Sequence, residues 1–382
     1  MSRKTRGGVP GAIVLDHRAL GRATLARQLL LARERIPVLK AVERLGPLQA
    51  QLPRPPFVAL HARLLGFERE DLVAPLRDRK IVRGTLMRGT LHLVSARDYL
   101  RFRPALAAVL TEAGRVMLES RARGLDLDAV AAAARPLFAE KPRSFEDVRE
   151  HLQRRFPKAD HRAMGYAARM RLPLLQVPGE GRFGFPSIAD FVHAETWLGV
   201  RVPDEAKPDA AVLSYLEAFG PASLADAQGF LGLPGLSPVL ERLRPRLATF
   251  RDLKGRELFD LPDAPRPKGD TKAPARFLPD FDSLILAHAD RSRLIADEHR
   301  PALATRNLRI PPTVLLDGRV AGTWDVETKK GTATLLVRSF APVARKDRDA
   351  LAEEGEALWR FAEPEARGVA VRFSATRTRP SA

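Results

Sequence analysis

The chain has 382 residues, 45% of them hydrophobic, which is enough for several globular domains. It contains no cysteine, so disulfides, thiol catalysis and the cysteine-ligated zinc sites of fingers and nucleobase deaminases are excluded. Lys and Arg number 64 against 46 acidic residues, a net charge of +18. This excess predicts a polyanionic partner, nucleic acid before an anionic membrane, although a genome rich in Arg codons gives the same composition.

No apolar stretch reaches the ~18 residues of a membrane span. The N-terminal segment MSRKTRGGVPGAIV is basic and lacks an apolar core of signal-peptide length. We therefore expect a cytoplasmic protein without membrane contact, associated with the nucleoid if its partner is DNA.

Apolar residues recur at helical spacing in four N-terminal segments, residues 16–35, 38–45, 57–66 and 69–79. Two short strands follow, KIVRGTLM and TLHLVS, and then a helix capped by Ser95. Helices followed by a two-stranded hairpin are the plan of a winged helix. We assign the first winged helix to residues 14–110.

The same plan is predicted twice more. In two places a serine caps a helix with an aspartate three residues later, as in a capping box: Ser144 with Asp147, and Ser223 with Asp226. The hairpins LPLLQVPGEGRFGF and LATFRDLKGRELFDL follow. GEGRFG matches a phosphate-binding GxGxxG, but we expect a strand after it and interpret it as a hairpin turn. The second winged helix is assigned to residues 111–200 and the third to 205–262.

The C-terminal part changes character. Residues 263–275 are rich in Pro and charge and predict a linker. PPTVLLDGRVAGTWDV then predicts two strands about an Asp317-Gly318 turn. We assign a β-rich domain to residues 276–375 and a disordered tail to 376–382. The fold class is therefore α+β, with three tandem winged helices followed by a β-rich domain.

Basic residues on the first hairpin are candidate DNA ligands. Arg83, Arg88 and His92 would lie on a wing, where Arg suits backbone phosphates, although surface solubility alone also explains them. The eight histidines are scattered, and none of their spacings suggests a metal site. We expect no metal and no cofactor.

The segment FLPDFDSLILAHADRSRLI, residues 277–295, concentrates charge in an apolar context. It is either a buried polar network that braces a cleft, with arginines that reach phosphates, or an amphipathic element with a solvated face. Its candidate residues are, for the cleft, Asp282 and Asp290, and, for DNA, His288, Arg291 and Arg293.

The stretch LGPLQAQLPRP, residues 45–55, places Gln49 and Gln51 one residue apart. Neutral amides are neither strong acids nor strong bases. Together they can hold a water, which accepts a hydrogen bond from an amide N–H and donates one to an amide oxygen. Alternatively, one or both glutamines bond to a helix end.

Four blocks, GPLQAQ, RGTLMRGTLHLVSARDY, LPDFDSLILAHADRSRLI and LLDGRVAGTW, occur in the order found in AlkZ-type bacterial DNA glycosylases, and the chain resembles that family from about residue 14 to 375. The resemblance implies a C-shaped DNA clamp that excises N-alkylated purines and in some members unhooks interstrand crosslinks. The family's catalytic signature falls on Gln49-Ala50-Gln51, in the double-glutamine version associated with unhooking and genotoxin self-resistance.

The resemblance also implies a β-hairpin near the lesion. The Asp317-Gly318 turn is our candidate for that hairpin, with Arg319 as a DNA ligand and Trp324 as a cleft residue.

An N7-alkylguanine carries a fixed positive charge and leaves without a general acid, so the enzyme mainly has to place a water at the sugar carbon. We predict a monofunctional DNA glycosylase for cationic N-alkylated purines, including bulky adducts or interstrand crosslinks. It would act as a monomer on double-stranded DNA, and no lysine suggests lyase activity. The alternative is a non-catalytic winged-helix regulator that binds undamaged DNA sequence-specifically.

Overall fold

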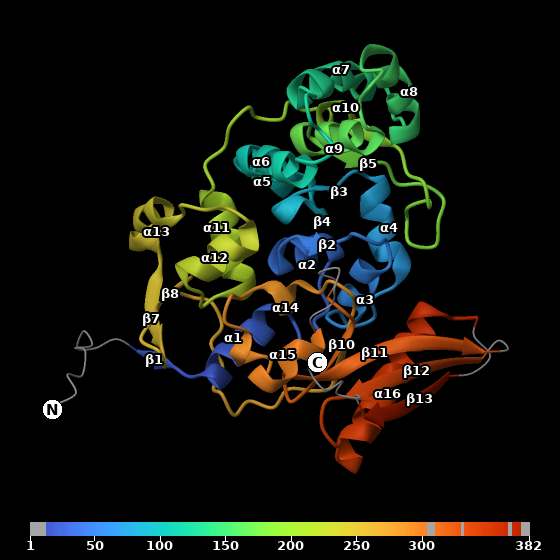
Figure 1. Cartoon of the computed structure of the whole chain (residues 1–382). Coiled ribbons are helices and arrows are strands. Elements are labelled where there is room, and N and C mark those ends of the chain that lie inside the picture. The colour runs from blue at the N-terminus through green and yellow to red at the C-terminus, as the bar shows by residue number, and fades with distance from the viewer. Residues whose placement is uncertain (1–12, 304–309, 330–331, 366–368, 376–382) are drawn as a thin grey trace.

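The computed structural model describes residues 13–303, 310–329, 332–365 and 369–375, so the predicted tail at 376–382 lies outside the described residues. Helices and strands are mixed along the chain, in agreement with an α+β fold, and the strands form three sheets (Figure 1). Within the described ranges, no helix is both long and apolar enough to cross a bilayer.

The N-terminal part begins with a short strand and a capped helix. The Asp16 side chain accepts from the Ala19 N–H at 2.7 Å, which starts α1. This helix ends well before residue 35, and Leu29 turns the chain with a φ of 54°. The elements are β1 (Val14–Leu15), α1 (His17–Arg27), α2 (Val38–Leu45), β2 (Leu48–Gln49), α3 (Pro55–His61), α4 (Arg69–Arg77), β3 (Ile81–Thr85), β4 (Leu91–Ser95) and α5 (Ala96–Ala105).

The second part contains the first predicted capping box. The Ser144 side chain accepts from the Asp147 N–H, and Asp147 accepts from the Ser144 N–H, which confirms that prediction. The predicted second hairpin is wrong in its second strand, because GEGRFG lies in a loop and the strand follows later. The elements are α6 (Ala107–Leu118), α7 (Leu127–Glu140), α8 (Phe145–Arg155), α9 (His161–Arg171), β5 (Leu174–Gln176), β6 (Phe191–His193) and α10 (Ala194–Leu198).

The third part contains the capping box at Ser223 and Asp226 and the hairpin turn near Gly255, both as predicted. β1 pairs in parallel with β7, so the N-terminus joins this hairpin. Arg27 of α1 also forms a buried, two-bonded ion pair with Asp260. The elements are α11 (Asp209–Phe219), α12 (Leu224–Leu231), α13 (Ser237–Leu243), β7 (Ala248–Asp252) and β8 (Glu257–Asp260).

The C-terminal part is a five-stranded sheet in the order β13-β12-β11-β10-β9, packed against α16. The predicted turn is confirmed, with Asp317 and Gly318 both at positive φ (41° and 71°). The elements are β9 (Arg276–Leu278), α14 (Ser283–Leu286), α15 (Arg300–Leu303), β10 (Thr313–Leu316), β11 (Arg319–Lys329), β12 (Thr332–Ser339), α16 (Arg345–Ala362) and β13 (Val369–Ala375). Short 3-10 turns lie at Met87–Gly89, Arg244–Arg246, Arg291–Arg293 and Asp297–His299.

Three groups of helices are each followed by an antiparallel strand pair, β3–β4, β5–β6 and β7–β8. The first two pairs share one sheet, because β3 also pairs with β5 and gives the order β2-β4-β3-β5-β6. This joining was not foreseen. The interpretation as winged helices, the domain boundaries and the C-shaped clamp stay predictions.

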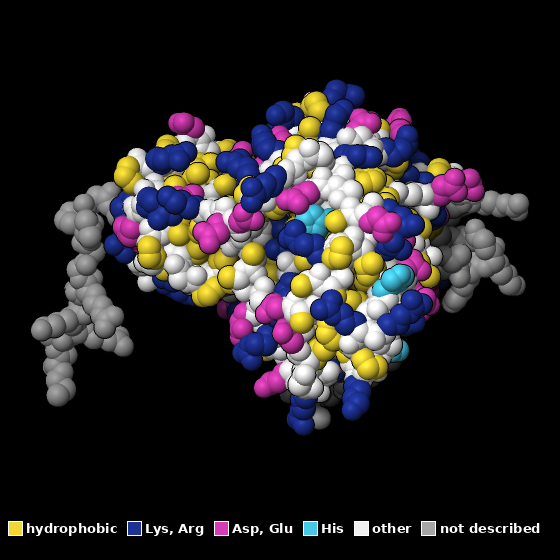
Figure 2. Space-filling model, turned by 90° about the horizontal axis from the view of Figure 1, so that it is seen from above, with side chains coloured by type: hydrophobic (Ala, Val, Ile, Leu, Met, Phe, Trp, Pro, Cys, Tyr) yellow, Lys and Arg dark blue, Asp and Glu magenta, His cyan; other side chains and the backbone are white. Residues whose placement is uncertain are grey.

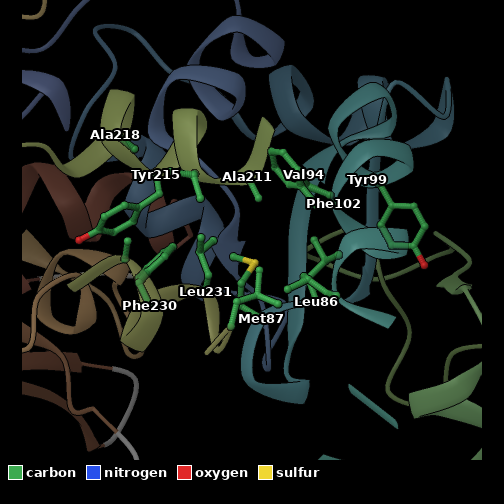
Figure 3. Close-up of a cluster of buried hydrophobic side chains, with 14 of the residues drawn as sticks. Leu86, Met87, Val94, Tyr99, Phe102, Ala211, Tyr215, Ala218, Phe230 and Leu231 are labelled. Carbon is green, nitrogen blue, oxygen red and sulfur yellow. The ribbon is translucent and has the colours of Figure 1, made fainter. Parts of the chain in front are cut away.

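The largest hydrophobic core lies between the first hairpin and the third part of the chain. Met87 from the β3–β4 turn lies beside Leu231 of α12, and Tyr215 of α11 and Phe230 belong to the same cluster (Figure 3). This packing fixes the β3–β4 turn against α12, and the turn carries the side chain that contacts Gln49.

Candidate active site

The QAQ motif lies at the end of a short strand. Gly46, with a φ of 74°, turns the chain out of α2, and β2 then pairs with β4 so that Gln49 lies opposite His92. Ala50 and Gln51 follow the strand, and the Ala50 N–H donates to the Leu91 carbonyl at 2.7 Å. The Gln49 side chain is buried, whereas Gln51 is exposed. Ala50 is 1% exposed and belongs to a hydrophobic core, which explains the small middle residue of the motif.

Both glutamine oxygens accept hydrogen bonds from the protein. Arg88 Nη2 donates to Gln49 Oε1 at 3.2 Å, and the Leu91 N–H donates to Gln51 Oε1 at 3.3 Å. Each partner is a donor only, so the oxygen of each amide must face it. Neither NH2 group has an acceptor among the described residues, and each oxygen keeps a second lone pair. The pair can therefore both donate to and accept from a small molecule in the site.

Arg83 supports the backbone of the motif. It donates to the Ala50 carbonyl through Nε (2.9 Å) and Nη2 (2.7 Å) and lies over the Phe185 ring. Burial, with a smaller contribution from the charge of Arg169, lowers the pKa of Arg83 to about 10. The side chain is buried, so the expected phosphate contact does not fit its position.

The Arg88 side chain is also held by contacts within the protein. It adopts a left-handed conformation (φ 55°) in the β3–β4 turn, donates to the Phe230 carbonyl and lies 5.2 Å from the Phe230 ring centroid. Burial lowers the pKa of Arg88 to about 10. The expected wing contact with DNA is thus replaced by contacts that join the QAQ motif to α12.

His92, expected to contact DNA, is fully buried. Its Nδ1–H donates to the Thr90 carbonyl at 3.0 Å, and its Nε2 has no partner among the described residues. Burial, together with the charge of Arg88, lowers the pKa of His92 to about 3. The ring is therefore neutral at physiological pH.

We expect acid to destabilise the protein through its buried histidines. Burial, aided by nearby arginines, lowers the pKa of His92 and His288 to about 3 and that of His61 to about 4. These rings stay neutral in the folded state, whereas in the unfolded chain they bind protons below about pH 6.5. Their contribution is fully present above that pH and is lost as the pH falls toward 4 for His61 and toward 3 for His92 and His288. Urea unfolding should show a loss of about 2 kcal/mol per ring between pH 7 and pH 5.

The variant His92→Phe isolates one of these rings. Whatever its stability at pH 7, its loss between pH 7 and pH 5 should be smaller than that of the unchanged protein by about 2 kcal/mol. An identical pH dependence in the two proteins would exclude His92 as a source of the acid effect.

The segment 277–295 is the buried polar network, not the solvated face. Asp282 binds Arg63 through both oxygens at 2.9 Å. His288 Nε2 lies 2.9 Å from the Phe219 carbonyl, and Arg293 donates to the Pro221 carbonyl at 3.0 Å. The Asp290 carboxylate forms an ion pair with Lys254, which lies in the turn between β7 and β8.

These contacts tie the segment to the first and third parts of the chain. His288 and Arg293 are buried, so the expected DNA contact does not fit them. Arg291 is partly exposed, and its role in DNA binding stays a prediction.

The Asp317-Gly318 turn is held against α1. Arg22 donates to the Asp317 backbone and side chain, and a Cβ on Gly318 would meet Arg22 and Leu25. Arg319 Nη1 lies 3.4 Å from the Ser292 carbonyl. The Trp324 indole N–H donates to the Leu278 carbonyl at 2.8 Å, and its ring is buried beside Phe277. The turn is therefore braced by α1, while the Asp317 side chain stays exposed, and its role at a lesion stays a prediction.

Sequence reasoning missed that the arginines support the motif. One signal was available for Arg83, which shares a strand face with the apolar Ile81 and therefore points inward. The separate ion pair of Arg63 with Asp282, which lies 219 residues away, had no local signal in the sequence. Among the described residues, no three His, Asp or Glu side chains come together as metal ligands would.

Residues 42–361, which contain all four sequence blocks, match the family model described as DNA glycosylase AlkZ-like. The chain belongs to the AlkZ-like DNA glycosylase family. A relative in this family, the interstrand DNA cross-link repair glycosylase of Streptomyces sahachiroi, is 31% identical over 166 residues, which cover 41% of this chain and 43% of that protein.

The solved structure of the Streptomyces sahachiroi DNA glycosylase AlkZ has the same fold. It matches with a TM-score of 0.76 at 21% identity, over 95% of this chain and 100% of that one. The chain therefore shares the family and the fold of AlkZ-like proteins. Its sequence alignment spans less than half of the curated relative's length.

Proposed function

We propose that the protein is a monofunctional DNA glycosylase that hydrolyses the N-glycosidic bond of cationic N-alkylated purines such as N7-alkylguanine. Bulky adducts or interstrand crosslinks are included, and the substrate is double-stranded DNA bound by a monomer. The observation that carries the proposal is the fixed pair of amides, Gln49 and Gln51, whose oxygens are held by Arg88 and the Leu91 N–H. Membership of the family supports the reaction class.

In the proposed reaction, one amide NH2 donates to the water, and the water donates to the second lone pair of the other amide oxygen. One lone pair of the water remains to attack C1′. The C1′–N9 bond breaks with its electrons going to the purine, which leaves as a neutral base. The water oxygen bonds to C1′ and releases its proton to solvent. Because glutamine adds no negative charge, this site favours lesions that are already cationic.

DNA binding is proposed to use the basic surface and three winged helices that clamp the duplex. Lys and Arg side chains are spread over much of the face seen from above, with acidic side chains between them (Figure 2). No single basic patch dominates that face. This distribution suits contacts with backbone phosphates along a duplex.

Incubation with a duplex that carries one N7-methylguanine tests the proposal. We expect strand breaks at the lesion only after alkali treatment, because a monofunctional enzyme leaves an intact backbone at the abasic site. An undamaged duplex of the same sequence is the control. Absence of breaks, together with sequence-dependent binding to undamaged DNA, would reject the glycosylase in favour of the regulator.

A further inference from the structure

A cavity of about 540 Å³ lies beside the QAQ motif. Its walls come from the start of α3, the link between β9 and α14, the two prolines before β10, and the strands β11 and β12. Leu52, which directly follows Gln51, is 45% exposed and lines this cavity. Because successive Cα atoms are about 3.8 Å apart, the cavity begins one residue from the proposed catalytic pair.

The walls of the cavity are stiff. Pro55, Pro279, Pro311 and Pro312 all line it, and proline fixes the backbone torsion φ. Next to Asp280, Phe281 adopts a φ of 60°, which a bulky side chain rarely does, and its N–H donates to the Ile310 carbonyl at 3.2 Å. Such strain persists where surrounding structure enforces it, often at ligand sites. The cavity is therefore preformed.

The lining mixes apolar side chains with the charged Asp280, Asp325 and Arg338, and it includes one buried donor. Val58, Val326 and Trp324 supply apolar surface. Arg54 also lines the cavity, and its Nη2 is buried without a hydrogen-bond partner among the described residues. A buried unpaired N–H is costly, so this group favours a ligand that brings an acceptor.

The volume is too large for a methyl substituent. Pockets of about 300–1,000 Å³ typically hold drug-sized organic molecules. Methylated purine at the Gln pair would leave the cavity unused, whereas a larger group on the same base can extend into it.

We propose that this cavity holds the substituent of a bulky N-alkylated purine, a group that combines an apolar part with a hydrogen-bond acceptor for Arg54. The inference rests on the proposed glycosylase activity and adds the residues that select large adducts. Small lesions need only the Gln49 and Gln51 pair.

Val326→Trp tests this by filling the cavity from β11. Single-turnover excision is measured on duplexes with N7-methylguanine or N7-benzylguanine. We expect the variant to excise N7-methylguanine within about twofold of the unchanged protein and N7-benzylguanine at least roughly tenfold more slowly, as changes in apolar pockets do. Val116→Trp, the same change at a residue 58% exposed on α6, is the matched control and should alter neither rate.

Arg54→Met provides a second variant if Val326→Trp fails to fold. It should slow excision of a benzyl adduct with a para-acetyl oxygen more than that of N7-methylguanine. If the unchanged protein excises N7-methylguanine and the variants change the rates on the two lesions equally, the cavity proposal is overturned and the proposed function stands. Excision of neither lesion by the unchanged protein would overturn both.

Discussion

Gln49→Ala and Gln51→Ala are each expected to slow excision of N7-methylguanine by roughly 100-fold, the scale on which a single oriented hydrogen-bonding group acts in an active site. Each change removes one of the two amides that hold the water, while Ala50 and the Arg83 contact to its carbonyl remain. The rates come from alkali-revealed strand breaks with enzyme in excess. DNA binding, followed by fluorescence anisotropy, should stay within about threefold because neither amide is proposed to hold the backbone.

Three further variants separate water placement from general damage. Gln153→Ala changes a glutamine that caps the end of α8 and should leave the rate unaltered. Arg88→Met keeps both glutamines but frees the Gln49 oxygen, so an intermediate loss is expected. The double variant of Gln49 and Gln51 should be little slower than either single variant, because groups that act as a unit are not additive. Undiminished excision in both single variants would refute the role of the pair.

Asp282→Ala is expected to lower the free energy of unfolding by about 3–5 kcal/mol, because it leaves a buried arginine without its counter-charge. Arg63 and Asp282 are 1% and 2% exposed, and both carboxylate oxygens accept from the guanidinium. The same carboxylate accepts from the Leu284 N–H and so starts α14. Urea unfolding measures the loss.

Two comparisons show whether the cost comes from the unpaired charge. Arg63→Met combined with Asp282→Leu removes both charges and should recover most of the stability, since an apolar pair of similar volume is often neutral. Asp204→Ala breaks an exposed ion pair with Arg201 and should hardly move the unfolding midpoint. A double variant as unstable as Asp282→Ala would instead point to lost packing or helix capping.

Local signals in the sequence predicted local structure well. Ser144 and Ser223 cap helices as expected, and Asp317-Gly318 forms the expected turn, because each depends on residues within a few positions. The second strand of the hairpin after α9 was predicted too early. The glycine-rich segment GEGRFG has the composition of a tight turn, but it is part of a long loop between β5 and β6. The pairing of β3 with β5 has no local signal at all.

The candidate site was predicted only in part. The positions of Gln49 and Gln51 followed from a motif. The arginines around them were expected at the surface because charged side chains are usually exposed. Burial of Arg83 and Arg88 depends on carbonyl groups of Ala50 and Phe230, which approach only in the folded chain. The cavity likewise joins α3 to strands more than 250 residues later.

The ion pair of Arg27 with Asp260 has a consequence for synthesis on the ribosome. The two residues are separated by 233 positions, and β1 likewise pairs with β7. At about 5–20 residues per second, α1 emerges on the order of ten to fifty seconds before its partner exists. This helix is therefore made long before it can form these contacts. Throughout that interval its apolar face is open to chaperones and to other nascent chains.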